Sequence, residues 1–262
     1  MCFFALIMSI QTAERSSFLD PSDNVIFQRH LFAYLMAKPF VAGHTVELGC
    51  GEGYGLKILA PLANKYFAFD KYVPTNINLD EIPNLTFRKM LFPEIDWDTN
   101  SFDTAISFQV IEHIYDDHKF VAEVARILKP GGKLILTTPN KPMSLTRNPW
   151  HEREYFEKEL KAVLSKSFAD VKIQGISGDR LVMNYFEQNK ASVKNITRWD
   201  IFNLQYNLPN FMLRIPYDIM NRMNRKKLLK SDNSTALGIN AENYFLSDSM
   251  DNSFDFFCIA TK

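Results

Sequence analysis

Cysteine is scarce in this sequence. Three occur in 262 residues, Cys2, Cys50 and Cys258, and they lie far apart along the chain. An odd number of widely spaced cysteines excludes a disulfide framework and offers no metal-ligand spacing. We therefore expect a reducing, cytoplasmic location.

A long hydrophobic run is also missing. The apolar stretch MCFFALIM at the amino terminus has eight residues and no basic residue. It is too short for the apolar region of a secretory signal with its flanks, and much too short to span a bilayer. An alternative is that translation begins at Met8. The sequence predicts a soluble protein without an integral membrane segment.

An excess of charge of one sign is absent as well. The chain has 30 basic and 30 acidic residues, so its formal net charge is zero. A chain-wide basic field of the kind that nucleic-acid binding uses is therefore lacking. We expect no nucleic-acid partner, and the sequence leaves the oligomeric state open.

Short apolar runs alternate with helical patterns along much of the chain. Expected strands lie at 45–48, 66–69, 85–89, 104–108, 133–138, 171–176 and 255–261, and expected helices at 25–38, 56–63, 117–128 and 152–167. This alternation indicates an α/β fold, a parallel sheet with crossover helices. We divide the chain into an amino-terminal extension (1–24), a core (25–178), an insertion that forms a lid over the active site (179–253) and a last core strand (254–262).

Glycine is not abundant, yet four of the ten glycines stand at alternate positions in VELGCGEGYG, residues 46–55. Between a strand and a helix they allow a tight turn and a close approach to a ligand. The dinucleotide pattern G-x-G-x-x-G does not fit, because the third position falls on Tyr54 or Leu56.

Two carboxylates accompany this loop. Glu47 precedes it and would repel a pyrophosphate but attract a cationic ligand. Asp70 ends the next expected strand, where a carboxylate can accept both hydroxyls of a ribose. A ribose with free hydroxyls and a positively charged tail describes S-adenosylmethionine.

Four ordered motifs carry a family resemblance: ELGCGEGYG, FAFD, NSFDTAISFQVIEHI and RILKPGGKLILTTPN. Together they resemble the class I S-adenosylmethionine-dependent methyltransferases, closest to the methyltransferase-11-like group, over residues 25–178 and again in the terminal strand. The resemblance implies a Rossmann-like, seven-stranded, mostly parallel sheet with an antiparallel last strand and a helical insertion before it.

The resemblance also implies cofactor contacts. The loop backbone at Gly49, Cys50 and Gly51 would lie along the methionine portion, with Glu47 near its ammonium. Many relatives carry an acidic residue after the third strand, and Leu91 stands there instead, so apolar packing and backbone groups would hold the adenine. The cofactor residues implied are Glu47, Gly49, Cys50, Gly51, Asp70 (ribose), Lys71 (adenine), Met90, Leu91 and Gln109 (methionine end).

Candidate catalytic groups follow the fourth and fifth expected strands, whose carboxyl ends face the ligand crevice. Glu112 and His113 come after the fourth, and His113 could act as a general base. His151 comes after the fifth and could contact an acceptor. Structural roles in loop orientation or helix capping remain the alternative for all three. Some ubiquinone-biosynthesis O-methyltransferases, which look similar here, hold a divalent metal with two acidic residues, but the first position is Gln109, so no metal is predicted.

Two further features have open interpretations. His30 on the first expected helix caps the cofactor pocket or lies at the surface. The amphipathic segment 210–230 ends in basic residues and is a lid over the acceptor, a peripheral patch on anionic lipid, or a helix that covers the sheet edge.

The expected function is methyl transfer from S-adenosylmethionine to a small-molecule acceptor. Relatives with the HEREYFEKEL segment look like methyltransferases of cell-surface glycan pathways, so O-methylation of a small molecule or sugar is the first hypothesis. The alternatives are a quinone or lipid methyltransferase, which requires an apolar pocket beneath 210–230, and a non-catalytic protein that binds S-adenosylmethionine. An NAD(P)-dependent oxidoreductase is a further alternative, although its glycine spacing is missing.

Overall fold

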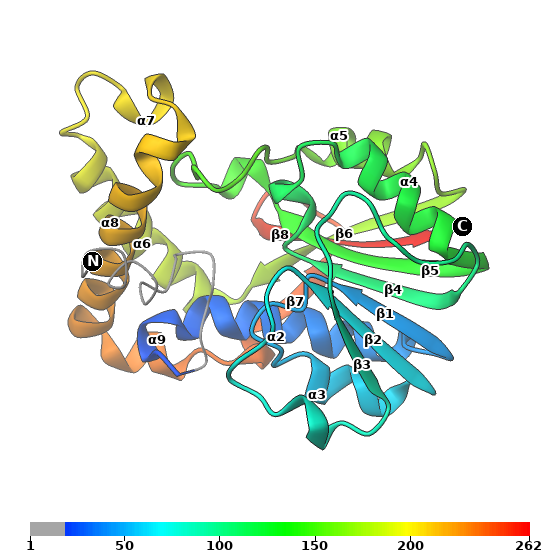
Figure 1. Ribbon diagram of the computed structural model, residues 1–262. Coiled ribbons are helices and arrows are strands. Elements are labelled where there is room, and N and C mark those ends of the chain that lie inside the picture. Colours follow the sequence, from blue (N-terminus) through cyan, green and yellow to red (C-terminus); the bar gives the residue numbers. More distant parts are fainter. Residues whose placement is uncertain (1–18) are drawn as a thin grey trace, which may run out of the picture.

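An eight-stranded sheet runs through the molecule, with strand order β3-β2-β1-β4-β5-β8-β6-β7 (Figure 1). The computed structural model describes residues 19–262, so the predictions for MCFFALIM and Met8 lie outside the described residues. The strands are β1 His44–Leu48, β2 Lys65–Asp70, β3 Leu85–Lys89, β4 Phe102–Phe108, β5 Leu128–Pro139, β6 Asp170–Gly178, β7 Tyr244–Ser247 and β8 Ser253–Thr261. The helices are α2 Asn24–Ala37, α3 Leu56–Leu59, α4 Asp117–Ile127, α5 Glu157–Leu164, α6 Arg180–Thr197, α7 Leu204–Asn207, α8 Asn210–Ser231 and α9 Asn233–Gly238.

The pairing confirms the predicted α/β sheet and its antiparallel last strand. The strand pairs among β1 to β5 are parallel, whereas β8 lies antiparallel between β5 and β6. The predicted count of seven strands is wrong by one, because β7 adds an antiparallel edge strand beside β6. This strand has four residues, YFLS, inside a polar segment, too short for its alternation to be recognised in the sequence.

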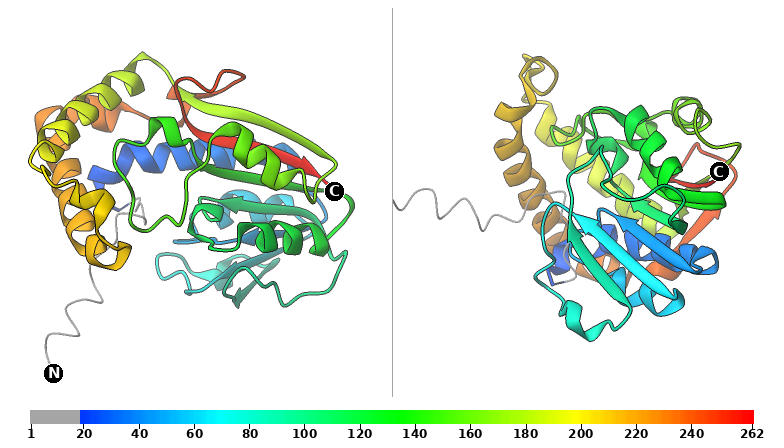
Figure 2. Two further views of the ribbon diagram at one scale, coloured as in Figure 1. Left: turned by 90° about the horizontal axis from the view of Figure 1, so that it is seen from above. Right: turned by 45° about the vertical axis from the view of Figure 1, so that its right-hand side comes forward.

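Both faces of the sheet are covered by helices (Figures 1 and 2). Val46 of β1 packs into the same core as Phe120 of α4, while Tyr66 of β2 packs into a second core with Phe32 of α2. Because the central strands are buried on both sides, apolar residues stand at successive positions in them, as in YFAF of β2 and LIL of β5. The cores hold the strands rigidly, so the loops at the strand ends start from fixed positions.

The helix predicted at 152–167 is shorter in the structure. α5 begins only at Glu157, after Phe156 as its N-cap residue. The backbone N–H of Glu152 donates to the carbonyl oxygen of Glu112 at 2.8 Å, which ties the preceding residues to the turn after β4. Tyr155 forms an isolated parallel bridge with Asn140. Residues 150–155 therefore form an extended loop against the sheet, although the sequence predicts the first turn of a helix from residue 152 onward.

Residues 179–253, called the insertion below, contain α6 to α9 and β7. Its helices stand together beyond one edge of the sheet (Figures 1 and 2). Arg222 and Arg225 of α8 contact Asp23 beside the start of α2, with N–O distances of 2.7 and 2.8 Å. At its base the insertion leaves and rejoins the sheet at paired positions, because Ser177 of β6 is the partner of Ser253 of β8. Within residues 19–262, no helix combines the length and the apolar character needed to cross a membrane.

Candidate active site

The candidate site lies at the carboxyl ends of the parallel strands. The sheet reverses its order between β1 and β4, and such a switch point is where open α/β sheets bind ligands. The glycine loop follows β1, Asp70 ends β2 and Gln109 follows β4. The structure thus brings the main cofactor-binding candidates predicted from the sequence together at the carboxyl ends of β1, β2 and β4.

The glycine loop adopts backbone conformations that favour glycine. Gly49, Gly51 and Gly53 have φ angles of +84°, +54° and +80°. A Cβ on Gly49 would come within 2.4 Å of the Val110 side chain, whereas a Cβ on Gly51 would meet nothing within 4 Å. The loop is therefore packed against the protein at Gly49 and faces open space at Gly51. That open space is what the close approach of a ligand to the backbone requires.

Asp70 holds the glycine loop in place. Its Oδ2 accepts a hydrogen bond from the backbone N–H of Gly51, and its Oδ1 accepts one from that of Tyr72, both at 2.9 Å. Each oxygen of an ionised carboxylate has a second acceptor site, so hydroxyl groups of a ligand can still bind there. The position fits the ribose contact expected from the sequence.

Glu47 lies beneath the loop and is buried. Its two oxygens accept hydrogen bonds from Tyr34 Oη at 2.6 Å and Tyr66 Oη at 2.7 Å. Burial raises the pKa of Glu47 to about 7, and it also raises the pKa of both tyrosines. In the described part of the chain, Glu47 lines neither of the two cavities described next. Any effect of Glu47 on a ligand thus passes through the loop above it.

The residues expected around the adenine have different environments. Lys71 is exposed, with its ammonium 5.2 Å from the centre of the Tyr72 ring. Met90 is buried, and its backbone N–H donates to the carbonyl oxygen of Asp70 at 3.0 Å. Leu91 is 73% exposed. The surface beside Asp70 is consequently open.

A small cavity of about 100 Å³ lies against the glycine loop. Its walls include Gly49, Cys50 and Gly51 together with Gln109. Gln109 has a left-handed backbone conformation with φ of +55°, which is uncommon for a residue other than glycine. Its Nε2 donates to Thr137 Oγ1 at 3.3 Å. Four of the predicted contacts of the methionine portion therefore share one cavity, whereas the fifth, Glu47, does not line it.

A much larger cavity, of about 710 Å³, adjoins the small one. The insertion supplies many apolar wall residues, among them Val182, Phe186, Ile196, Leu208, Met212 and Met220. The sheet edge supplies polar residues, including Glu112, His113 and His151. His30, Gln109 and Asp255 line both cavities. The position of His30 agrees with the pocket interpretation rather than with a surface histidine.

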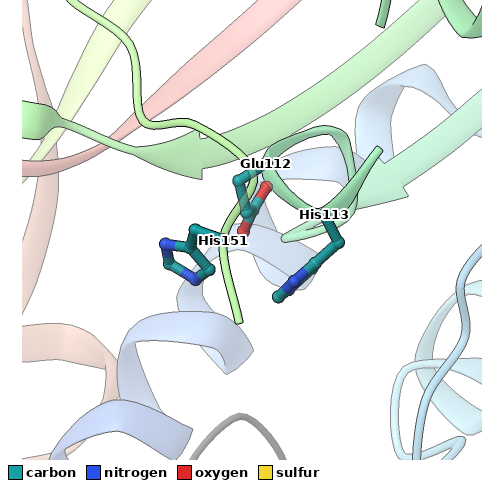
Figure 3. Close-up of side chains that lie close together, drawn as sticks. All are labelled: Glu112, His113 and His151. Carbon is teal, nitrogen blue, oxygen red and sulfur yellow. The ribbon is translucent and has the colours of Figure 1, made fainter. Parts of the chain in front are cut away.

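Glu112, His113 and His151 form a cluster in which one ligand atom from each lies within 4.8 Å of the others, and Figure 3 shows the three side chains around a common space. Glu112 is buried, accepts a hydrogen bond from Thr138 Oγ1 at 2.9 Å, and has its pKa raised by burial. His113 Nδ1 lies 2.9 Å from the carbonyl oxygen of Trp150. Since a carbonyl only accepts, Nδ1 is the donor, and Nε2 carries the lone pair of the neutral ring.

His151 is held by neighbours in its own loop. Its Nδ1 lies 2.8 Å from Glu154 Oε1 and its Nε2 lies 2.9 Å from Asn148 Nδ2. The spacing of the cluster could suit a divalent cation. Because both ring nitrogens of His151 have partners, a cation bound by this ring would have to displace either Asn148 or Glu154. We therefore treat the cluster as a hydrogen-bonded group, and the absence of a metal stays a prediction.

Asp255 is a candidate that sequence reasoning missed. It lies at the beginning of β8, opposite Pro139 at the end of β5, and is 1% exposed. Its Oδ2 is 2.9 Å from Arg29 Nε. The catalytic candidates predicted from the sequence all follow the carboxyl ends of parallel strands. An antiparallel strand has its amino end there instead, so its first residues reach the same site. The predicted antiparallel last strand was the signal that could have pointed to Asp255.

Comparisons with known proteins agree with this geometry. Residues 46–136 match the family described as methyltransferase domain. A protein of Mycobacterium tuberculosis named as a probable S-adenosylmethionine-dependent methyltransferase is 34% identical over 169 residues, which is 61% of this chain and 61% of the relative. A protein of Maricaulis maris named ubiquinone biosynthesis O-methyltransferase is 27% identical over 110 residues, covering 40% of this chain and 43% of the relative.

One solved structure with a similar fold is phosphoethanolamine N-methyltransferase 2 of Haemonchus contortus in complex with S-adenosyl-L-methionine. It has a TM-score of 0.52 at 16% identity, covering 92% of this chain and 57% of that one. The chain spans about 61% of the length of the mycobacterial relative. At 16% identity, the likeness to the solved structure concerns the fold alone.

Proposed function

Because this chain belongs, through residues 46–136, to the class I S-adenosylmethionine-dependent methyltransferases, we propose that it transfers a methyl group from this cofactor to a hydroxyl of an amphiphilic small molecule. The observation that carries the proposal is the meeting of the two cavities at His30, Gln109 and Asp255. Bound S-adenosylmethionine supplies a methyl group on a positively charged sulfur. The protein's part is to align an acceptor with that methyl and to exclude water.

The small cavity receives the methionine portion of the cofactor in this proposal. The open space at Gly51 and the remaining acceptor sites of Asp70 support it. The loop backbone at Gly49, Cys50 and Gly51 lies along the methionine, and Asp70 binds the ribose. The adenine extends over the open surface near Met90 and Leu91, with Lys71 beside it.

The large cavity receives the acceptor. Its volume of about 710 Å³ falls in the range of roughly 300–1,000 Å³ that is usual for small-molecule sites. Its apolar wall suits a hydrocarbon portion, while the polar residues at the sheet edge suit a hydroxyl-bearing head group. An acceptor that has both parts fits the cavity better than a fully polar one.

This view favours the quinone or lipid alternative for the body of the acceptor. The alternative requires an apolar pocket beneath residues 210–230, and Met212, Leu213 and Met220 of α8 line the cavity. The name of the Maricaulis maris relative, ubiquinone biosynthesis O-methyltransferase, agrees with an acceptor of this class. A sugar of a cell-surface glycan pathway remains a prediction for the head group.

His113 contacts the head group of the acceptor through Nε2. Its Nδ1 is engaged by the Trp150 carbonyl, which fixes the ring with Nε2 on the opposite side. Glu112 and His151 pack beside it and restrict its orientation. The insertion covers this site as a lid, and α8 forms its outer wall.

The test combines binding with product identification. Calorimetric titration with S-adenosylhomocysteine should show binding, and NADH in the same assay should show none. The protein is then incubated with methyl-labelled S-adenosylmethionine and, separately, with the organic and aqueous fractions of a cell extract. Label should enter a compound of the organic fraction, to be identified by mass spectrometry. Cofactor binding without transfer into either fraction would support the non-catalytic alternative, and NADH binding alone would support the oxidoreductase.

A further inference from the structure

Asp255 occupies the wall that the two cavities share. It is the third residue of β8 and lines the cofactor cavity together with Gln109 and Thr137, and it also lines the larger cavity together with His151. Among the described residues, His113 and His151 line the larger cavity and not the smaller one. A group at this shared wall is close to both partners of a transfer reaction.

One oxygen of Asp255 lacks a hydrogen-bond donor. Oδ2 faces Arg29 Nε at 2.9 Å, but Oδ1 is buried and has no hydrogen-bond partner within residues 19–262. The Gln109 amide lies close enough to lower the pKa of Asp255, yet it does not complete a hydrogen bond to Oδ1. Buried carboxylate oxygens are almost always paired, because an unpaired one has lost its water without compensation. A donor that arrives with a ligand would complete this site.

We propose that Asp255 is a catalytic residue whose Oδ1 accepts a hydrogen bond from the acceptor hydroxyl and takes its proton during methyl transfer. The proposal rests on the proposed function. Arg29 Nε faces the other oxygen at 2.9 Å, which leaves Oδ1 as the oxygen available to accept. The acceptor is then an alcohol, phenol or other O–H compound rather than a tertiary amine or a thioether, which have no proton to give.

The step balances without a further reactant. The acceptor oxygen forms a bond to the methyl carbon while the bond between that carbon and sulfur breaks, and its electron pair stays on sulfur. The hydroxyl proton moves to Asp255 Oδ1, so the carboxylate becomes a neutral acid. The positive charge of the sulfonium and the negative charge of Asp255 disappear together, and Arg29 keeps its charge. Solvent recovers the proton after the product leaves.

The groups around Asp255 determine the sign of its pH dependence. Burial raises the pKa of Asp255, whereas Arg29 of α2 and Gln109 after β4 lower it. Glu154 also raises it and His151 lowers it, both from the loop after β5. Tyr244 of β7 also lies close to Asp255, and burial raises the pKa of its phenol, while His30 of α2 lines the same two cavities. Only the ionised form of Asp255 can take a proton, so the rate should fall as pH falls through its pKa.

The deciding experiment uses Asp255→Asn in the full chain, with Asp251→Asn as a matched control at an exposed position in the turn before β8. Asparagine keeps the shape and can accept a hydrogen bond, but it cannot take a proton. Turnover is measured with labelled S-adenosylmethionine and the organic extract fraction, and the affinity for S-adenosylhomocysteine is measured by calorimetry. We expect Asp255→Asn to lower kcat by about a hundredfold or more, with affinity unchanged within about threefold and the low-pH limb of the profile lost.

Several outcomes would overturn the proposal. Turnover close to wild type in Asp255→Asn would remove the proton-accepting role. Weakened S-adenosylhomocysteine binding with little change in kcat would assign Asp255 to the cofactor amine instead. Loss of the low-pH limb in His113→Ala, with the limb retained in Asp255→Asn, would transfer the role to His113. Failure of the wild type to bind S-adenosylhomocysteine or to transfer label would refute the proposed function, and this inference with it.

Discussion

Glu47 makes the stability of the protein depend on pH in an unusual direction. In the folded chain its pKa is raised from 4.5 to about 7, so between these values the folded state binds a proton that the unfolded state has released. The free energy of unfolding therefore falls as pH rises from about 4.5 to 7 and levels off above. A shift of this size corresponds to roughly 3 kcal/mol at most.

Glu47→Gln should remove this dependence. The amide keeps the shape and can accept from one tyrosine while donating to the other, but it does not titrate. Urea denaturation at pH 5 and at pH 8 should show a smaller loss of stability in the variant than in the wild type. Glu187→Gln, at an exposed position on α6, serves as the control and should follow the wild type. Parallel pH profiles for all three proteins would contradict the raised pKa.

Asp70 should contribute directly to cofactor affinity. Its oxygens position the backbone of Gly51 and Tyr72, and in our proposal they also accept the ribose hydroxyls. Asp70→Ala should weaken the binding of S-adenosylhomocysteine by about 1.5–3 kcal/mol, the size expected for hydrogen bonds to a charged group. Calorimetry measures the change, and unaltered affinity would rule out the ribose contact.

His113 should affect turnover and leave cofactor binding intact. It lines the larger cavity, where we propose that the acceptor binds, and within residues 19–262 it is not part of the cavity at the glycine loop. His113→Ala should lower the rate of label transfer, while calorimetry with S-adenosylhomocysteine should match the wild type. An unchanged rate would return His113 to a structural role in the loop after β4.

At the scale of elements, α8 has a face suited to a lipid surface. The exposed residues Phe211, Ile215, Ile219 and Met223 follow one another at intervals of four along the helix. At about 100° per residue, Lys226 and Lys230 fall on the same side further along. Within 210–230 the one acidic residue, Asp218, is buried. We propose that this face makes a peripheral contact with anionic lipid, which would bring an amphiphilic acceptor to the cavity behind it.

Vesicle binding tests this contact. Sedimentation should show more protein bound to vesicles that contain phosphatidylglycerol than to phosphatidylcholine alone, with less binding at high salt. Ile219→Asp should reduce binding severalfold. Leu62→Asp is a matched control, because Leu62 is 47% exposed and Ile219 is 49% exposed. Leu62 belongs to residues 25–178 and lies outside the insertion. Equal losses in both variants, or no binding by the wild type, would refute the proposal.

The sequence predicted the core elements well because their signals are local. Strands buried on both faces give apolar runs, and the stripe of Phe120 and Val124 identifies α4. Elements that depend on distant partners were missed or misplaced. α5 begins later than predicted because the backbone N–H of Glu152 donates a hydrogen bond to the turn after β4. β7 forms because β6 has an unpaired side to which another strand can add. No pattern within either segment records those partners.

The same distinction applies to the candidate site. The sequence predicts the glycine loop, Asp70 and Gln109 as candidates because each directly follows or ends a strand. That Glu47 is shielded by Tyr34 and Tyr66 could not be read from the sequence, since the three residues come from three elements. Asp255 required the strand order as well as the strand. The roles of all these residues in binding and catalysis remain predictions for the experiments above.

For the whole molecule, ligand binding should be visible as stabilisation. A ligand at a hundredfold excess over its Kd adds about 2.7 kcal/mol to the free energy of unfolding. For a chain of this size that corresponds to a rise in Tm of roughly 5–10 °C. Differential scanning fluorimetry should show this rise with S-adenosylhomocysteine and none with NADH. A rise with NADH alone would contradict the proposed cofactor.

The pairing of Ser177 with Ser253 has a consequence for how such a protein can diversify. The insertion begins and ends at neighbouring positions of one sheet, so a shorter or longer segment can join the same two positions, and among the strands only the edge strand β7 would change. The residues proposed to bind the cofactor lie at the ends of the parallel strands, outside this segment. Descendants of one ancestral chain could thus acquire new acceptors by exchanging a single segment while inheriting the methyl donor unchanged.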